Sequence, residues 1–196
     1  MIRNPLAPLV LVVAALAVLS PMLTACAPVI VAGAAVGGAL VATDRRSTGA
    51  QVDDQSIELK LTTELGTRYG DRIHLNVTSY NGIVLLTGEA PDSAIVDDIS
   101  KFARGTDRVR AVHNEMVVGP TTDLSARTND SYITSKVKTR FVEANKFSAT
   151  HVKVVTERSV VYLMGIVSKA EADAAAQIAS TTSGVTRVVK LFEITG

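Results

Sequence analysis

The residue best suited to covalent chemistry is Cys26, the single cysteine among 196 residues. A lone cysteine rules out an internal disulfide and leaves the thiol open to acylation. Cys26 follows Thr24 and Ala25, and small residues before a cleavage point are typical of the end of a secretory signal. The stretch before them has Arg3 near its start and an apolar run from Leu9 to Leu19. We therefore expect the chain to be exported and cut in front of Cys26.

The tetrapeptide Leu-Thr-Ala-Cys at 23–26 resembles the bacterial lipobox. This resemblance implies that residues 1–25 are a lipoprotein signal peptide and that Cys26 takes up diacylglycerol. Ala27 follows the cysteine, whereas an Asp at that place would retain a lipoprotein in the inner membrane. The resemblance thus implies an outer-membrane lipoprotein, lipid-anchored and facing the periplasm. The alternative is an ordinary signal peptide with an incidental cysteine.

A second apolar stretch runs from Ala27 to Ala42 and contains Pro28 and three glycines. It is shorter than the roughly 20 residues that a membrane-spanning helix needs, and glycines weaken a helix. It could lie on the membrane, pack against a partner or act as a spacer. We favour a spacer over residues 26–50 near the bilayer surface. A lipobox cysteine carries several acyl chains, so no spanning helix is needed for stable anchoring.

The remaining residues that could do chemistry form no catalytic pattern. His74 and His151 occupy equivalent places in an internal repeat described below, and His113 lies alone on a predicted strand. We find neither a cluster at metal-ligand spacing nor a nucleophile with a base. The Gly-rich run at 33–38 lacks the spacing of a phosphate loop. The sequence therefore predicts a protein that is not an enzyme and has no cofactor or metal.

Charge argues against nucleic acid as a partner. Removal of residues 1–25 takes away Arg3, which leaves 19 basic and 19 acidic residues in the mature chain. The mature chain therefore lacks the general excess of basic residues that is typical of nucleic-acid-binding proteins.

The strongest organisational feature is an internal repeat. Residues 82–88 (GIVLLTG) match residues 159–165 (SVVYLMG), and residues 74–77 (HLNV) match residues 151–154 (HVKV). Apolar positions upstream and downstream also align. The chain thus contains two copies of one unit, which we place at 51–119 and 128–196. A polar segment from Gly119 to Asn129 joins them.

Periodicity predicts the elements of the first unit. Ile57, Leu61 and Leu65 recur every four residues and predict a helix over 54–68, with Asp53 or Asp54 as its N-cap. Alternating apolar residues predict a strand over 73–77. The Asn-Gly pair at 81–82 predicts a two-residue hairpin leading into a strand at 83–88. A helix from about 91 to 104 and a strand at 109–118 complete an αββαβ order.

The second unit predicts the same order, with helices at 131–145 and 169–181 and strands at 151–156, 160–165 and 185–194. One difference is that Arg158 and Ser159 replace the Asn-Gly pair. We therefore expect the second turn to be longer or of another type. Ile133, Val137, Phe141 and Ala144 are expected to face the core.

The hairpin pattern of Gly82, Val84, Leu86 and Gly88, followed by Val109, Val112 and Asn114 on the last strand, resembles the BON domain. Two such units behind a lipobox and an Ala/Gly/Val spacer resemble the dual-BON outer-membrane lipoproteins. The resemblance covers nearly all of the mature chain. It implies an α+β fold of two tandem BON domains, each αββαβ with a three-stranded mixed sheet packed by two helices. It also implies binding of anionic phospholipid by the second domain, a role in outer-membrane integrity and a link to the outer-membrane assembly machinery.

The first helix of the second unit is the expected lipid-binding element. It is more basic than its counterpart, because Lys138 and Arg140 replace Thr62 and Glu64. The helical wheel places polar and apolar residues together on its outer side. The candidate membrane-binding residues are Tyr132, Ser135, Lys136, Lys138, Thr139 and Val142. Tyr suits an interface because its ring is apolar and its hydroxyl polar.

Two functions remain open. The chain could bind anionic phospholipid through the second unit and support the outer membrane. Alternatively, it could be a periplasmic scaffold that docks an envelope-assembly protein, with lipid contact only through the acyl anchor. A helix with a few lysines and one exposed tyrosine is also a common solvated surface, so the site residues remain a hypothesis.

Overall fold

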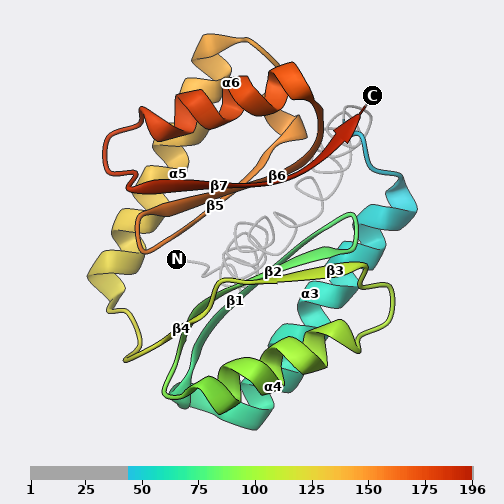
Figure 1. Cartoon of the computed structure of the whole chain (residues 1–196), viewed down its shortest axis with the longest axis vertical. Coiled ribbons are helices and arrows are strands. Elements are labelled where there is room, and N and C mark those ends of the chain that lie inside the picture. The colour runs from blue at the N-terminus through green and yellow to red at the C-terminus, as the bar shows by residue number, and fades with distance from the viewer. Residues whose placement is uncertain (1–43, 196) are drawn as a thin grey trace, which may run out of the picture. The chain divides into compact units, whose positions relative to one another are not determined.

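The computed structural model describes residues 44–195, and these carry two copies of one arrangement of helices and strands (Figure 1). The predicted signal peptide, Cys26 and the spacer up to residue 43 lie outside the described residues. The two copies together form one compact unit of the chain, from Asp44 to Gly196. Both hydrophobic cores lie within this segment.

The first copy contains α3 (Thr48–Tyr69), η2 (Gly70–Arg72), β1 (His74–Tyr80), β2 (Ile83–Ala90), α4 (Ser93–Arg104), β3 (Ala111–Asn114) and β4 (Val117–Val118). The second contains α5 (Leu124–Ala144), η3 (Ala149–His151), β5 (Lys153–Glu157), β6 (Val160–Ser168), α6 (Lys169–Ser180) and β7 (Arg187–Thr195). The predicted α+β class and the αββαβ order of each unit are confirmed.

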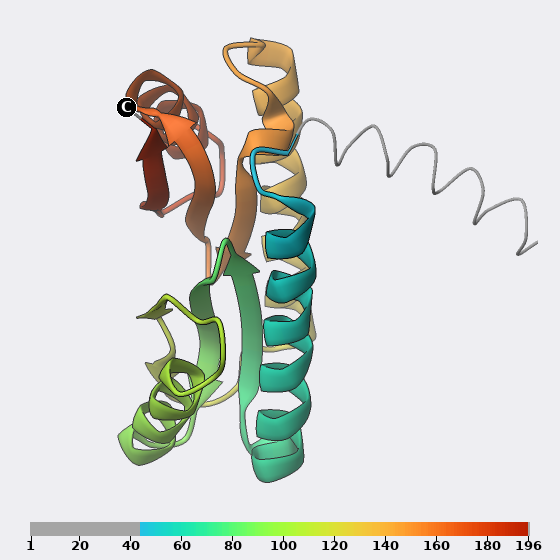
Figure 2. The ribbon, with the colours of Figure 1, turned by 90° about the vertical axis from the view of Figure 1, so that its right-hand side faces the viewer.

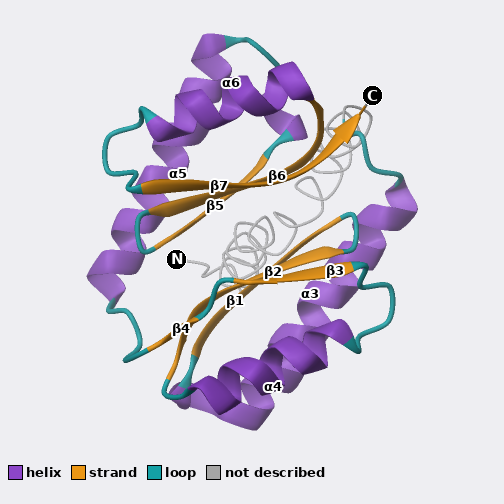
Figure 3. Ribbon diagram, in the orientation of Figure 1, coloured by secondary structure: helices purple, strands orange, loops and turns teal. Residues whose placement is uncertain are grey.

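Each domain has a mixed sheet with its second strand in the centre. β1 pairs antiparallel with β2, which pairs parallel with β3 and β4. β5 and β6 pair antiparallel, and β6 and β7 pair parallel. In each domain the two helices cover one face of the sheet (Figure 3). Figure 2 shows α3 as one long helix beside the β1–β2 hairpin.

Side-chain alternation along the central strands builds two different surfaces. Val84, Leu86 and Ala90 of β2 point into the core beneath α3 and α4, so Leu85, Thr87 and Glu89 project from the other face. The second domain repeats this alternation. Leu85 and Tyr80 of the first domain and Tyr162 and Met164 of the second form one buried cluster. This cluster explains why the helix-free faces are partly apolar, since they form a core that the two domains share.

Polar contacts also join the two domains. Lys153 Nζ donates to Glu58 Oε1 at 2.8 Å, and Asn76 Nδ2 donates to Glu157 Oε2 at 2.7 Å. Glu193 Oε1 accepts from Asn81 Nδ2 at 2.7 Å. The sequence contained no signal for these pairs, because their partners lie far apart along the chain.

The last strand of the first unit differs from the predicted strand at 109–118. It is interrupted at Glu115 and Met116, between β3 and β4. The side-chain oxygen of Asn114 accepts from Met116 N at 3.1 Å, and Met116 is buried in the core. The interruption thus adds an apolar side chain to the first core.

The segment predicted to link the units is shorter than expected. α5 begins at Leu124, inside the predicted linker at 119–129, and the side chain of Asp123 caps it by accepting from Ala126 N. Ala144, expected in the core, is exposed at the end of α5. Phe147 packs against Phe141 instead, with ring centroids 5.1 Å apart. The helix ends too early for Ala144 to be covered.

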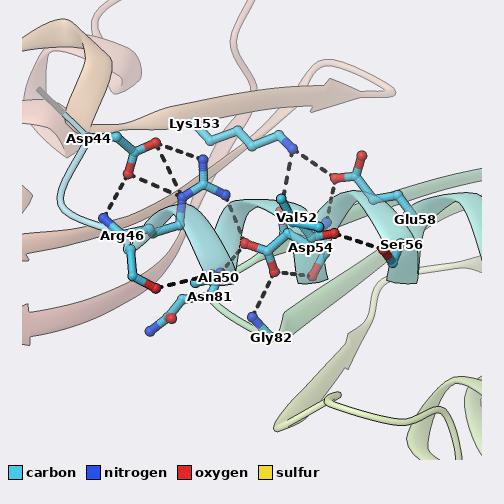
Figure 4. A network of polar contacts seen from close by, with 12 residues as sticks. Asp44, Arg46, Ala50, Val52, Asp54, Ser56, Glu58, Asn81, Gly82 and Lys153 are labelled. Carbon is cyan, nitrogen blue, oxygen red and sulfur yellow. Dashed lines mark hydrogen bonds and ion pairs between the residues drawn. The ribbon is translucent and has the colours of Figure 1, made fainter. Parts of the chain in front are cut away.

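The predicted N-cap at Asp53 or Asp54 is wrong. α3 begins at Thr48, and Ser47 is its N-cap. Asp54 is a buried residue whose carboxylate accepts from Ser79 Oγ, Asn81 N and Gly82 N at 2.7–2.8 Å (Figure 4). Arg46 donates to the same carboxylate at 2.8 Å. Asp54 therefore fixes the β1–β2 turn onto the helix rather than starting the helix.

Asp130, the repeat partner of Asp54, does the same in the second domain. Its two carboxylate oxygens accept from the backbone N–H groups of Arg158 and Ser159, each at 2.8 Å. Both turn residues have positive φ, 51° and 62°, as Asn81 and Gly82 do at 52° and 74°. The prediction of a different second turn is wrong, because charged hydrogen bonds from Asp130 hold two ordinary residues in the same two-residue turn.

Gly88 and Gly165 are required by close backbone approach in the two copies. A Cβ on Gly88 would lie 2.0 Å from the carbonyl oxygen of His74, and one on Gly165 would lie 2.4 Å from that of His151. These distances are too short for any side chain, so the glycines of the BON-like hairpin pattern are sterically fixed.

Substitution of Asp130 by Ala should lower the free energy of unfolding by about 2–4 kcal/mol, because two charge-assisted hydrogen bonds are lost and two turn N–H groups lose their partner. Chemical denaturation of residues 44–196 measures this. Ser159→Gly should have the opposite sign and stabilise by about 0.5 kcal/mol, since glycine tolerates the positive φ. An Asp130→Ala protein as stable as wild type would contradict the assigned role.

The Arg45–Glu171 ion pair generates a pH prediction. Hydrogen bonds from Arg45 outweigh partial burial and lower the pKa of Glu171 from 4.5 to about 2. A depressed pKa stabilises the folded state above the unfolded pKa and loses that effect as pH falls through the folded value. Arg45→Ala should therefore be less stable than wild type at pH 6, and the difference should shrink between pH 4.5 and pH 2. Thermal unfolding across this range checks it; a difference constant with pH would contradict it.

Candidate functional site

The outer face of α5 is the predicted site, and the structure exposes its apolar members. The side chains of Ile133, Val137 and Phe141 are fully buried against the second sheet. Because a helix turns every 3.6 residues, residues on its other side face solvent. Tyr132 and Val142 are 62% and 67% exposed. Leu124, in the first turn of α5, is exposed as well, at 77%.

A stripe along α5 contains most of the predicted residues. Helix geometry places Tyr132, Ser135, Thr139 and Val142 on one line, since they are spaced three or four residues apart. We call these four residues the α5 stripe. All four are exposed. Lys136 borders the stripe on one side and Lys138 on the other, so the structure brings the six predicted residues together on one helix face.

Lys136 is held in place rather than free in solvent. Its ammonium group donates to the carbonyl oxygen of Ser183 in the α6–β7 loop. It also lies 4.6 Å from the centroid of the Tyr132 ring, in cation–π geometry. These two contacts fix the orientation of Tyr132 beside a positive charge. Lys138, by contrast, is exposed on the far side of the stripe.

Arg140 was identified in the sequence only as part of the charge difference, and the structure assigns it a packing role. Its guanidinium donates to the carbonyl oxygen of Ile178 at 2.9 Å and to the hydroxyls of Thr182 and Thr181 at 2.7 and 3.1 Å. These groups lie at the C-terminal end of α6, where a helix favours positive charge. Arg140 thus ties α5 to α6.

A shallow groove of about 490 Å³ lies between α5 and the loop that follows α6. Its lining includes four of the predicted residues together with Arg140, Glu143 and residues 181–183. The four are Tyr132, Ser135, Lys136 and Thr139. Lys138 and Val142 do not line it. The lining combines the Tyr132 ring and several hydroxyl groups with the carboxylate of Glu143 and two cations, both of which already donate to protein oxygens.

Contacts within the protein take up part of the acidic charge of α3 and α5. Asp54 and Asp130 are both buried under their turns, and Glu58 is paired with Lys153 at 2.8 Å. Glu64, which Arg140 replaces in α5, is exposed. Along this face Tyr132 replaces Ser56, Lys138 replaces Thr62, Arg140 replaces Glu64 and Val142 replaces Gly66, whereas Ser135 replaces the exposed Leu59. The first helices of the two domains therefore differ here in both charge and apolar pattern.

The histidines have different surroundings. His151 Nδ1 lies 3.8 Å from Glu171, and His113 lies on β3. His74 lies beside two buried carboxylates, Glu89 and Glu157. This cluster was not predictable from the sequence, because its members come from three strands and two domains and share no motif spacing.

The structure does not describe Cys26, so its predicted acylation lies outside the described residues. Among residues 44–195, the helices are too short or too polar to cross a bilayer.

The BON domain model matches this chain twice, at residues 53–120 and 129–196. Together the two matches cover more than half of the chain, and both coincide with an αββαβ domain of the structure. The chain therefore belongs to the BON-domain family and carries two such domains in tandem.

Several curated proteins are similar over most of the chain. Outer membrane lipoprotein DolP of Haemophilus influenzae is 39% identical over 173 residues, which is 87% of this chain and 89% of that protein. The 21 kDa hemolysin of Actinobacillus pleuropneumoniae is 36% identical over 76% of this chain and 78% of its own length. Osmotically-inducible protein Y of Escherichia coli is 29% identical over 77% of each chain.

The basic residues of α5 differ in their contacts: Arg140 donates to groups at the end of α6, whereas Lys138 is exposed. Arg140→Ala should lower the free energy of unfolding by about 1–3 kcal/mol, because the carbonyl of Ile178 and two threonine hydroxyls lose a charged donor. Lys138→Ala should change it by no more than about 0.5 kcal/mol, as expected for an exposed residue. Urea unfolding of both variants checks this; equal effects would contradict the assignment of Arg140 to packing.

Proposed function

We propose that this protein is an outer-membrane lipoprotein, acylated at Cys26 and facing the periplasm, that binds anionic phospholipid through its second BON domain. In this role it supports the integrity of the outer membrane and catalyses no reaction. The observation that carries the proposal is the exposed α5 stripe with its bordering lysines. The similarity to a protein named outer membrane lipoprotein DolP supports the location.

The chemistry of the α5 stripe fits the boundary between headgroups and acyl chains. Tyr132 combines an apolar ring with a polar hydroxyl, which favours the interfacial region. Val142 adds apolar surface about three helical turns further along α5. Each lysine near an anionic surface contributes about 1 kcal/mol. Such contacts are weak by themselves, but acyl chains on Cys26 would keep the domain close to the bilayer, so weak binding would suffice to orient it.

The second candidate is a scaffold that docks an envelope-assembly protein. It is favoured by a different observation, the exposure of Val52 and Leu59 on α3, at 56% and 70%. These residues lie seven apart on one helix face. In this alternative, lipid contact is made only by the acyl anchor, and the α5 stripe is an ordinary solvated surface.

Sedimentation of residues 44–196 with liposomes tests the proposal, since this segment is a compact unit with both cores. Wild type should bind vesicles containing anionic phospholipid and not vesicles of zwitterionic lipid alone. Tyr132→Ala/Lys136→Glu/Lys138→Glu should weaken binding at least about tenfold, as the loss of two favourable charges and one interfacial ring requires.

Two controls keep the result interpretable. Lys60→Glu changes the charge at the α3 position equivalent to Lys136 and should leave binding close to wild type. Tyr132→Ala/Lys138→Glu spares Lys136 and its contact with Ser183, so it separates loss of binding from local unfolding. Wild type that fails to bind anionic vesicles would refute lipid recognition by the folded domains and favour the scaffold. Equal losses of vesicle binding in Lys60→Glu and in the α5 variants would show that binding depends only on net charge and not on the α5 stripe.

A further inference from the structure

Three ligand-type side chains converge where the two domains meet. His74 is the first residue of β1, Glu89 lies directly opposite it on β2, and Glu157 is the last residue of β5 in the other domain. His74 Nδ1 lies 3.0 Å from Glu89 Oε2 and 3.8 Å from Glu157 Oε1. One ligand atom from each residue lies within 4.8 Å of the other two. A single ion could contact all three after small side-chain shifts.

Both carboxylates are removed from solvent. The side chain of Glu89 is fully buried, and that of Glu157 is 5% exposed. Arg158 is the guanidinium closest to Glu89, at 3.8 Å, and its own side chain is about half exposed. Two buried carboxylates this close together repel one another, and a cation bound between them would offset that repulsion. The local charge therefore favours a divalent ion.

Neighbouring donors orient the carboxylates toward a common point. Asn76 Nδ2 and Thr87 Oγ1 both donate to Glu157 Oε2, at 2.7 and 3.3 Å. Glu157 Oε1 is thereby left on the side of His74. Thr122 donates to Glu89 through its backbone N–H and its hydroxyl. Hydrogen bonds that fix ligand carboxylates in this way are a regular feature of protein metal sites.

An ion can reach the cluster from solvent. A cleft of about 510 Å³ opens beside it, and its lining includes His74, Asn76 and Glu157. The cleft is bordered by residues of both domains, among them Arg127 and Thr134 of α5. Water in this cleft could complete the coordination of an ion that takes three protein ligands.

The internal repeat shows that the cluster is not a by-product of the fold. His151 occupies the place of His74 in the second domain, but Ile166 stands where Glu89 does and Tyr80 stands where Glu157 does. Since the backbone positions are equivalent and an apolar or aromatic residue fits there, the fold does not need a buried carboxylate at either place. The repeat also supplies His151 as a matched control.

We propose that His74, Glu89 and Glu157 form a binding site for a divalent transition-metal ion at the junction of the two BON domains. One imidazole and two carboxylates suit Zn²⁺ and its neighbours better than Mg²⁺ or Ca²⁺, which prefer oxygen ligands alone. Because the first domain supplies two ligands and the second supplies one, the bound ion clamps the domains together. The site is independent of the α5 stripe.

Isothermal titration of the untagged full chain in detergent, stripped of metal with a chelator, tests the site with Zn²⁺ as the probe. Wild type should bind one Zn²⁺ per chain at this site and gain thermal stability on binding. His74→Gln and Glu157→Gln should each weaken binding at least about tenfold, since removal of a mere supporting group already costs 10–100-fold. His151→Gln should bind as wild type does.

Mg²⁺ and Ca²⁺ serve as competitors and should displace Zn²⁺ only at much higher concentration. Circular dichroism of each variant confirms that it is folded, and the two Gln substitutions preserve side-chain size. Saturable binding that both variants retain at wild-type affinity would overturn the proposal, and so would wild type that is folded but does not bind Zn²⁺. Should one variant fail to fold, the other variant and wild type still decide the question.

Discussion

A buried aspartate that holds a β-turn is the interaction on which each domain depends. Asp54 and Asp130 reach from the first helix of their domain to the turn between its first two strands. This contact sets the helix against the hairpin, and the apolar stripe of the helix then lies over the central strand. In the first domain Arg46 joins the same carboxylate, so the segment before α3 is fixed as well. The buried charge is tolerated because backbone and side-chain donors satisfy its oxygens.

Much of the fold follows from local pattern, because periodicity and turn residues report local geometry. The repeat, the order of elements and the core residues Ile57, Leu61 and Leu65 were all predictable. The role of Asp54 was not predictable, because an aspartate near the start of a helix gives the same local sequence pattern whether it caps that helix or binds a turn between strands. The second turn was missed for the same reason, since Arg158 and Ser159 have no intrinsic preference for positive φ and need Asp130 to hold them there.

In the candidate site, too, local features were predictable from the sequence and long-range contacts were not. Exposure of Tyr132 and Val142 was predictable from the helical wheel, because burial of Ile133, Val137 and Phe141 determines which side is outside. The partners of Lys136 and Arg140 were not predictable, since they belong to the end of α6 and the loop beyond it. Likewise, helix-free sheet faces carry both the shared apolar cluster and the His74 group. Long-range pairings of this kind are decided by how the domains pack, which a single sequence does not display.

Arg45 has a mechanical consequence. It lies two residues before the N-cap of α3, yet its guanidinium makes two hydrogen bonds to Glu171 and one to the carbonyl oxygen of Ile166, all in the second domain. A pull on the chain ahead of Arg45 would therefore load both domains at once, rather than peel α3 away from its sheet first. Force applied at the amino-terminal end would reach the first domain through the peptide chain and the second domain through the Arg45–Glu171 ion pair. The ion pair would therefore spread that force over both domains.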